Sequence, residues 1–329
     1  MPSDTETDEK KQQEEEKSEP YYWHREYRLV FPEINLEYNN LDNKEGLHVT
    51  FDVSKDLTQE TNKAKIKIRN LSDESRQKIE KPDLKVDLYA GYRDMDGPKR
   101  IFSGSIITAI SQTTKQNIAD VLTSDEGTDV ITEINASDGQ VAVRDSVFAL
   151  SYAPGTDGKI IVKAIADNMG LPLILGDNVK FSAYDNGYSF VGRGGDALTE
   201  ICNGNGLTWS IQNGNLQIIL AGGTTSSKGL VFSASSGLIG SPARIIKAKP
   251  KEDKETPKKK RRKKEKKEKP EKRAGWKIET LLAPTVSPGD AIKVESRMIK
   301  GWFRVETIKH TGDSIGGQYK TQMDIIEGL

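Results

Sequence analysis

Residues 84–110 read LKVDLYAGYRDMDGPKRIFSGSIITAI, and this stretch decides the fold. Leu84, Val86 and Leu88 share one face of the run, with residues of the opposite face between them. Gly97-Pro98 then interrupts the alternation, which resumes further along the chain. Period-two alternation on both sides of a turn signal is typical of half-buried antiparallel strands. The stretch therefore predicts two such strands joined by a turn.

Similar runs occur towards both ends of the chain. We expect strands at residues 27–31, 47–53, 63–69, 86–90, 100–110, 116–122, 291–296 and 302–310. They form two strand-rich blocks, residues 27–122 and 230–326, whose shared pattern suggests a duplication although the blocks do not align residue by residue. In the second block Pro288-Gly289 predicts a type II turn, because glycine supplies the positive φ that this turn needs.

Helices are expected in three places. Ser72 is a suitable N-cap for a short helix that ends before Pro82. Residues 158–170 place apolar side chains at helical intervals and close on a glycine, and residues 196–202 predict a second central helix. Asn213-Gly214 between two alternating runs is a strong hairpin signal. The chain is therefore predicted to be α+β, mostly β, with a small α/β unit of helix plus hairpin in its centre.

The formal net charge of zero hides two opposed blocks. The first 20 residues carry eight acidic residues against three lysines, so residues 1–22 are expected to form a disordered acidic tail. Residues 247–273 carry sixteen basic residues against six acidic ones. Prolines in that stretch forbid one continuous helix, and we expect residues 249–274 to be an exposed, disordered basic insertion.

The basic insertion is the strongest candidate for a binding site. Clustered lysine and arginine attract phosphate because binding releases condensed counterions. The candidate contacts to phosphate or to a partner protein are Lys258, Lys259, Lys260, Arg261, Arg262, Lys263 and Lys264. No aromatic residue for base stacking lies between residues 249 and 274. A solvated connection between two strands, or a role inside an assembly, is the simpler interpretation.

The sequence contains no pattern for catalysis, a cofactor or a metal. Cys202 is the only cysteine, which excludes an intrachain disulfide and a cysteine metal cage. His24, His48 and His310 lack metal-ligand spacing, and we expect them to be surface or strand residues. The glycine-rich residues 192–195 lack the ending of a phosphate-binding loop and predict only a flexible helix entry. We therefore expect no enzyme activity, no cofactor and no metal site.

The N-terminus is charged where a signal peptide would be apolar. Apolar runs stay shorter than the roughly 20 residues that a membrane-spanning helix needs. We expect no membrane-spanning segment.

Two stretches carry a resemblance to a known family. Residues 68–106, with IRNLSDESRQKIE, VDLYAGY and IFSGSI, resemble the first tube-like domain of bacteriophage baseplate hub proteins of the late control D or Mu-like kind. Residues 275–326 are similar to the closing domain of these hubs, with a Pro-Gly-Asp turn, the strand GWFRV and the segment HTGD. The central unit and the charged insertion also fit. The resemblance covers nearly everything from Tyr27 onward.

The resemblance implies an architecture and a role. Two tube-like antiparallel β-barrel domains, residues 23–125 and 223–329, would flank an α/β middle region at residues 126–222. Three copies would form a pseudo-sixfold ring that joins the tail tube, or a tube-initiator protein, to the central spike protein. That ring would line the channel for the tape-measure protein and for DNA, with transient DNA contact in its lumen. The chain would be a structural virion protein of the tail baseplate, made in the host bacterial cytoplasm.

Two other functions stay open from the sequence alone. A nucleic-acid-binding module would use the lysine-rich segment and would show salt-sensitive DNA affinity that depends on it. A tail-associated cell-wall hydrolase would clear peptidoglycan and would lose that activity when one acidic residue is replaced. A hub is expected to do neither and to form a trimer.

Overall fold

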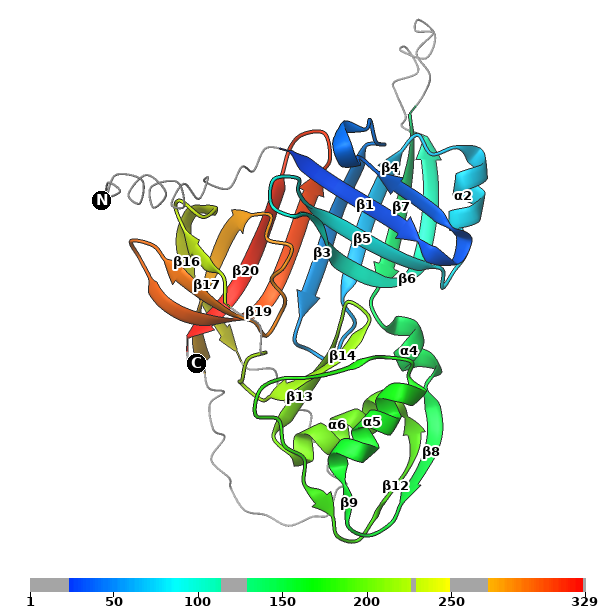
Figure 1. The fold of residues 1–329 in the computed structure, drawn as a ribbon, viewed down its shortest axis with the longest axis vertical. Helices are drawn as coiled ribbons and strands as arrows, with labels where there is room; N and C mark the ends of the chain where they lie inside the picture. Colours follow the sequence, from blue (N-terminus) through cyan, green and yellow to red (C-terminus); the bar gives the residue numbers. More distant parts are fainter. Residues whose placement is uncertain (1–23, 114–128, 226–228, 249–271, 328–329) are drawn as a thin grey trace, which may run out of the picture.

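The computed structural model describes residues 24–113, 129–225, 229–248 and 272–327. The predicted acidic tail, the strand predicted at residues 116–122 and most of the basic insertion lie outside these ranges. The fold is α+β and mostly β, as predicted. Figure 1 shows the N-terminal block beside the C-terminal block, with the middle region below both.

The N-terminal block is built from strands and three short helices. Its strands are β1 (Arg25–Phe31), β2 (Leu36–Asn39), β3 (Val49–Asp56), β4 (Lys63–Arg69), β5 (Lys85–Tyr92), β6 (Gly97–Thr113) and β7 (Val130–Ser137). Its helices are η1 (Pro32–Ile34), η2 (Leu41–Asn43) and α2 (Asp73–Ile79). The predicted cap of α2 is confirmed, because the Ser75 N–H donates to Ser72 Oγ at 3.3 Å.

The middle region contains the predicted helices and hairpin. Its elements are α4 (Gln140–Asp145), β8 (Val147–Tyr152), β9 (Thr156–Asp157), α5 (Gly158–Asn168), β10 (Leu173–Leu175), β11 (Ala183–Tyr184), β12 (Tyr188–Arg193), α6 (Gly194–Gly204), β13 (Leu207–Gln212) and β14 (Asn215–Leu220). The hairpin turn between β13 and β14 has positive φ at both Asn213 (53°) and Gly214 (76°), the conformation that Asn-Gly favours.

The C-terminal block repeats the strand-rich character of the first. Its strands are β15 (Val231–Ser233), β16 (Leu238–Ala248), β17 (Lys272–Leu281), β18 (Ala291–Glu295), β19 (Lys300–Asp313) and β20 (Tyr319–Glu327). The predicted type II turn is present, since Gly289 has φ of 93° and the Asp290 N–H donates to the Ser287 carbonyl at 3.1 Å.

The two blocks share one sheet, with the strand order β16-β17-β20-β19-β3-β4-β7-β6-β5-β1-β2. β18 pairs with β19 and β15 with β18 beside this path. The prediction of two separate barrels is therefore not confirmed, because β19 and β3 pair along their length and join the blocks. Alternation in a sequence indicates on which face of a sheet a side chain lies, but it does not indicate which strand pairs with which.

Strand β7 lies at the boundary between the N-terminal block and the middle region, and its sheet partners could not be predicted from the sequence pattern. The sequence placed residues 126–222 together in the middle region, whereas β7 pairs with β4 and β6 in the main sheet. Its Ile134 and Ala136 are buried in the core of the N-terminal block. The middle region that packs separately begins after β7.

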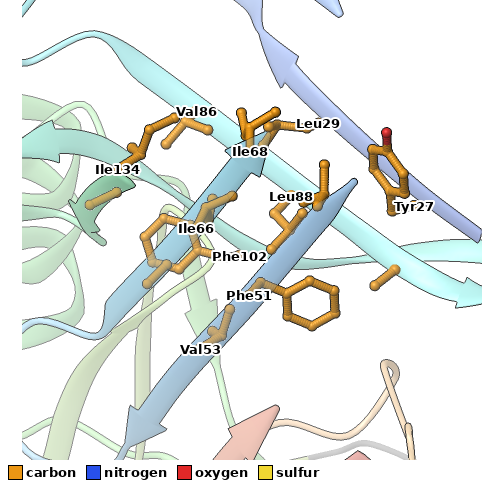
Figure 2. Close-up of a cluster of buried hydrophobic side chains, with 14 of the residues drawn as sticks. Tyr27, Leu29, Phe51, Val53, Ile66, Ile68, Val86, Leu88, Phe102 and Ile134 are labelled. Atoms are coloured by element: carbon orange, nitrogen blue, oxygen red, sulfur yellow. The ribbon is translucent and has the colours of Figure 1, made fainter. Parts of the chain in front are cut away.

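Each part has its own hydrophobic cluster. Figure 2 shows the cluster of the N-terminal block, where side chains from β1, β3, β4, β5, β6 and β7 meet. In the middle region, α5 and α6 pack with the β13–β14 hairpin. No helix in the described ranges has both the length and the apolar character that crossing a bilayer requires.

The β19–β3 pairing depends on a glycine. Gly312 of β19 lies opposite Phe51 of β3, and a Cβ added at Gly312 would stand 2.1 Å from the Phe51 ring. Phe51 in turn packs edge-on against Tyr319, with ring centroids 6.0 Å apart. The absence of a side chain at Gly312 therefore lets a large aromatic ring lie across the junction of the two blocks.

A second junction forms around Tyr319, at the start of β20. The Tyr319 hydroxyl lies 2.8 Å from the Glu26 carbonyl, 3.1 Å from the Gly91 carbonyl and 3.1 Å from the Gly91 N–H. The Tyr92 hydroxyl accepts from the Leu282 N–H at 3.2 Å. β20 is thereby tied to β1 and β5, which lie on the far side of the N-terminal cluster from β4.

The middle region docks through the tip of its hairpin onto buried polar residues in β3 and beside the ends of β4 and β7. Lys55 Nζ donates to Asn213 Oδ1 at 2.6 Å, and the Gly214 N–H donates to Asp138 Oδ1 at 2.9 Å. Asn62 Nδ2 donates to the Ile211 carbonyl at 2.6 Å. Burial raises the pKa of Asp138 and lowers the pKa of Lys55 to about 8. These hydrogen bonds are directional, so they fix the orientation of the middle region relative to the sheet.

Removing the Tyr319 hydroxyl should weaken the second junction. In Tyr319→Phe the buried polar groups of Glu26 and Gly91 lose a shared partner, and we expect the free energy of unfolding to fall by about 1–3 kcal/mol. Chemical denaturation measures this change. The control is Tyr89→Phe on the neighbouring β5, where the ring is partly exposed; an equal loss there would contradict the role assigned to Tyr319.

Lys55 should make stability depend on pH in a defined window. Its pKa is about 8 in the fold against about 10.4 in the unfolded chain, so the unfolded chain binds more protons between these values. The free energy of unfolding should therefore rise with pH across this window, by up to about 3 kcal/mol. Lys55→Met should lack this rise, whereas Lys63→Met, which removes an exposed lysine, should keep it. Parallel pH profiles for all three proteins would contradict the assignment.

Candidate functional site

The side of the shared sheet that faces away from the hydrophobic clusters is polar. In β4, Ala64, Ile66 and Ile68 are buried, whereas Lys63 and Lys65 on the other face are exposed. The same alternation continues through β3, β7, β17, β19 and β20. We call this side the polar face; its residues include Asp52, Ser54, Lys63, Lys65, Lys67, Glu133, Asn135, Lys277, Glu279, Thr307, Lys309, Thr311, Lys320, Gln322 and Asp324.

The polar face runs without interruption across the junction of the blocks. Lys309 Nζ of β19 lies 3.1 Å from Asp52 Oδ1 of β3. Thr311 Oγ1 donates to the same Asp52 oxygen at 2.9 Å. Thr311 lies directly opposite Asp52, and Lys309 lies diagonal to it. Such cross-strand pairs stabilise a sheet, and here they connect two blocks that are far apart in the sequence.

Charges of both signs alternate over the face. Glu133 lies between Lys65 Nζ at 2.7 Å and Lys67 Nζ at 3.5 Å. The hydrogen bond from Lys65 lowers the pKa of Glu133. Glu279 accepts from Gln322 at 2.9 Å and from Lys320 at 2.7 Å, and these two contacts lower its pKa. The face is densely charged, and Lys65, Lys67, Lys309 and Lys320 each lie within 3.5 Å of a carboxylate oxygen.

A shallow hollow of about 300 Å³ lies on the face where β3, β4, β17, β19 and β20 meet. Its lining includes Lys63, Lys277 and Lys309 together with Asp56 and Asp324. The lining therefore carries charges of both signs.

The two blocks have the same strand order. In the N-terminal block the order is β3-β4-β7-β6, and in the C-terminal block it is β16-β17-β20-β19. β5 then pairs with β6, and β18 pairs with β19 in the equivalent position. The duplication that the sequence suggested is therefore visible in the topology.

A bulge fixes the correspondence residue by residue. The β6–β7 register shifts between Ile106 and Thr108, and the β19–β20 register shifts between Val305 and Thr307. Just after each shift a threonine bonds with the neighbouring strand. Asn135 Nδ2 donates to Thr108 Oγ1 at 3.1 Å, and Thr307 Oγ1 donates to Asp324 Oδ2 at 2.9 Å. Thr108 and Thr307 are thus equivalent positions of the two blocks.

The predicted contact residues 258–264 lie outside the described residues. The insertion that contains them lies between β16 and β17 in the sequence, and the last pair between these two strands is Ala248 with Lys272. The residues of the polar face were not predicted as a site. The alternating lysines of residues 63–69 were a visible signal, but the sequence could not indicate that β3 and β19 extend the same face.

The other residues considered from the sequence have structural roles. His310 is fully buried with Nδ1 2.9 Å from Thr321 Oγ1, and burial together with the nearby Lys55 charge lowers its pKa to about 3. His24 and His48 lie 3.0 Å from Asp94 and Asp313 respectively.

The glycine-rich residues before α6 also serve packing. Gly194 and Gly195 begin α6 and are buried beside Met169 and Trp209. Cys202 is a buried residue of the same helix, and burial raises its pKa to about 12. Among the described residues, no three histidine, cysteine or acidic side chains are grouped so that they could hold a metal ion.

Comparison by sequence finds no relative. No protein-family model matches the chain, and no curated protein matches it.

Comparison by structure does find relatives. The 43 kDa tail protein of prophage MuSo2 from Shewanella oneidensis is 9% identical, with a TM-score of 0.56 over 92% of this chain and 97% of that chain. A tail protein from Neisseria meningitidis MC58 is 12% identical, with a TM-score of 0.57 over 93% of this chain and 97% of that chain. The c3393 protein of E. coli is 10% identical, with a TM-score of 0.54 over 86% of this chain and 74% of that chain.

The c3393 protein is described as a component of the type VI secretion system with structural similarity to the T4 bacteriophage tail proteins gp27 and gp5. Each similarity covers most of both chains. Because the sequence identities are low, the similarities establish the fold alone. The resemblance read from the sequence is thus confirmed at the level of the fold: the chain has the fold of phage tail proteins and of their counterpart in a type VI secretion system.

Proposed function

We propose that the chain is a structural hub subunit of a phage-type tail, in which three copies form a ring with six wall segments. One observation carries the proposal: the same strand order occurs twice, and the two copies of it are joined edge to edge through β3 and β19 into one sheet. A joint of this head-to-tail kind can be repeated around an axis, and it gives a closed ring when the rotation closes.

In this proposal the polar face lines the channel. A passing DNA molecule presents a dense row of phosphates, which unpaired lysines would retain. Lys65, Lys309 and Lys320 instead lie within 3.1 Å of carboxylate oxygens. The wall stays wet and charged while its net attraction for a polyanion is small, so the tape-measure protein and DNA can leave.

The remaining partners follow from the position of such a ring. The tail tube or a tube-initiator protein would continue it at one end, and the central spike protein would attach at the other. The protein would lie in the tail baseplate of a virion. Support for this placement is the shared fold with phage tail proteins and with the type VI secretion component.

The proposal gives the basic insertion a secondary place. It lies between β16 and β17 in the sequence, and Lys258 and its neighbours would touch phosphate, the acidic N-terminal tail or a neighbouring protein. A nucleic-acid-binding module is the alternative that its composition favours.

The purified full chain, alone or with its tube and spike neighbours, should have the mass of a trimer. Imaging by electron microscopy should show a central opening with six repeating wall features. The reason is that β19 and β3 join the two equivalent blocks within the chain, and the equivalent edges of β6 and β16 are left open to join the next copy. A particle that stays monomeric with its neighbours present, or one without an opening, would refute the proposal.

Deleting residues 251–272 separates the two functions. A hub should keep its trimer mass and its central opening. A DNA-binding module should instead lose a salt-sensitive DNA affinity, and the loss should be at least tenfold at low salt. The matched control deletes residues 2–18 of the acidic tail, which should not reduce DNA affinity.

A further inference from the structure

Two strand edges of the main sheet remain open among the described residues. β6 pairs with β5 only as far as Ser105, whereas it pairs with β7 as far as Thr113. The outer edge of β6 is therefore unpaired from Ile107 onward within the described residues. β16 pairs with β17 on one side, and the part of the chain that the structure describes places no strand on its other side. Open edges recruit further strands unless they are covered.

These two edges are the equivalents of the two that are joined within the chain. β6 corresponds to β19, and β16 corresponds to β3, because each holds the same place in its block. The pairing of β19 with β3 within the chain is therefore a template for the pairing of β6 with β16 between two copies. The second joint of the same kind needs another copy of the chain.

The internal repeat also gives the register of that second joint. Thr108 is equivalent to Thr307, so Ile110 is equivalent to Lys309. Lys65 and Lys277 lie opposite the equivalent residues Asn135 and Asp324.

The correspondence extends to the edge strands. Asp52 lies opposite Lys65 and Ala243 lies opposite Lys277, so these two are equivalent, and Ser54 is then equivalent to Ile245. Within the chain Lys309 lies opposite Ser54. Ile110 should accordingly lie opposite Ile245 of the next copy.

The side chains at this register support the match. Ile107 and Ile110 on the β6 edge are 44% and 50% exposed, and Ile239 on the β16 edge is 39% exposed. Ile245 is partly exposed on the same side of the sheet. The centre of the polar face is charged, whereas exposed isoleucines lie at its two open edges. Apolar side chains in such a position indicate a surface that is covered in the assembled state.

We infer that the copies of this chain join through antiparallel pairing of β6 with β16 of the neighbour, with Ile110 opposite the neighbour's Ile245. This inference rests on the proposed ring and specifies its contact. At the joint within the chain the equivalent place holds Lys309 opposite Ser54, and Lys309 forms an ion pair with the adjacent Asp52. The joint between copies replaces that charged contact by an apolar one, so each edge favours its own partner.

A cysteine pair tests the register. Ile110→Cys with Ile245→Cys places two thiols on directly opposite positions, about 4.5–5.5 Å apart at Cβ, within reach of a disulfide or a short bifunctional maleimide. We expect covalent dimers and trimers as the main products. Either single variant, and the unchanged chain with its buried Cys202, should give background only.

The matched control moves one thiol along the same strand. Ile110→Cys with Ile239→Cys uses the same edges, with the second thiol roughly 20 Å further along β16. It should give background cross-linking. Cross-linking of this pair, or of neither pair, in a preparation that is trimeric by mass would overturn the inferred joint and leave the proposed ring intact. A chain that is monomeric with its neighbours present would overturn the ring itself.

A charge exchange tests the same contact without thiols. Ile110→Asp should raise the dissociation constant of the trimer at least tenfold, and adding Ile245→Lys should restore most of the affinity. Ile160→Asp is the control, since Ile160 is 57% exposed on α5, away from both edges. Equal effects of Ile110→Asp and Ile160→Asp, or no recovery in the double variant with an unchanged thermal midpoint, would overturn the inference.

Discussion

The pairing of β19 with β3 is the constraint on which the rest of the structure depends. It turns two blocks with separate hydrophobic clusters into one sheet with one continuous polar face. Gly312 makes the approach of the strands compatible with the Phe51 ring, and Asp52 ties the strands on the other face. Without this pairing the chain would be two small β units, and the polar face would have a gap in its middle.

The middle region is held in a different way from the two blocks. Its contact with the sheet uses Lys55, Asn62, Asp138 and the hairpin tip, all of them polar and buried or nearly so. Buried charged groups contribute little net stability, but they permit few alternative arrangements. The polar contact thus serves orientation, whereas the helices and hairpin of the module are stabilised by their own apolar cluster.

Local structure was predictable from the sequence and long-range structure was not. Ser72 as a cap, the Asn213-Gly214 hairpin and the Pro288-Gly289 turn all have local causes, and the structure confirms them. The sequence grouped β7 with the middle region, whereas in the structure it pairs with β4 and β6, and a residue pattern does not indicate which strands become neighbours. The polar face was missed for the same reason, while the lysines at residues 258–264 were prominent only as composition. A resemblance carried by short motifs indicated the fold, which the structural relatives then supported.

The separation of the paired strands along the chain has a consequence for synthesis. Asp52 and Thr311, which meet at the joint, are 259 residues apart. At a ribosomal rate of about 5–20 residues per second, β3 waits roughly 10–50 s for its partner. During that interval its outward edge is bare in a crowded compartment. Charged side chains on an exposed strand edge oppose pairing with other nascent chains, and β3 carries Asp52, Lys55 and Asp56.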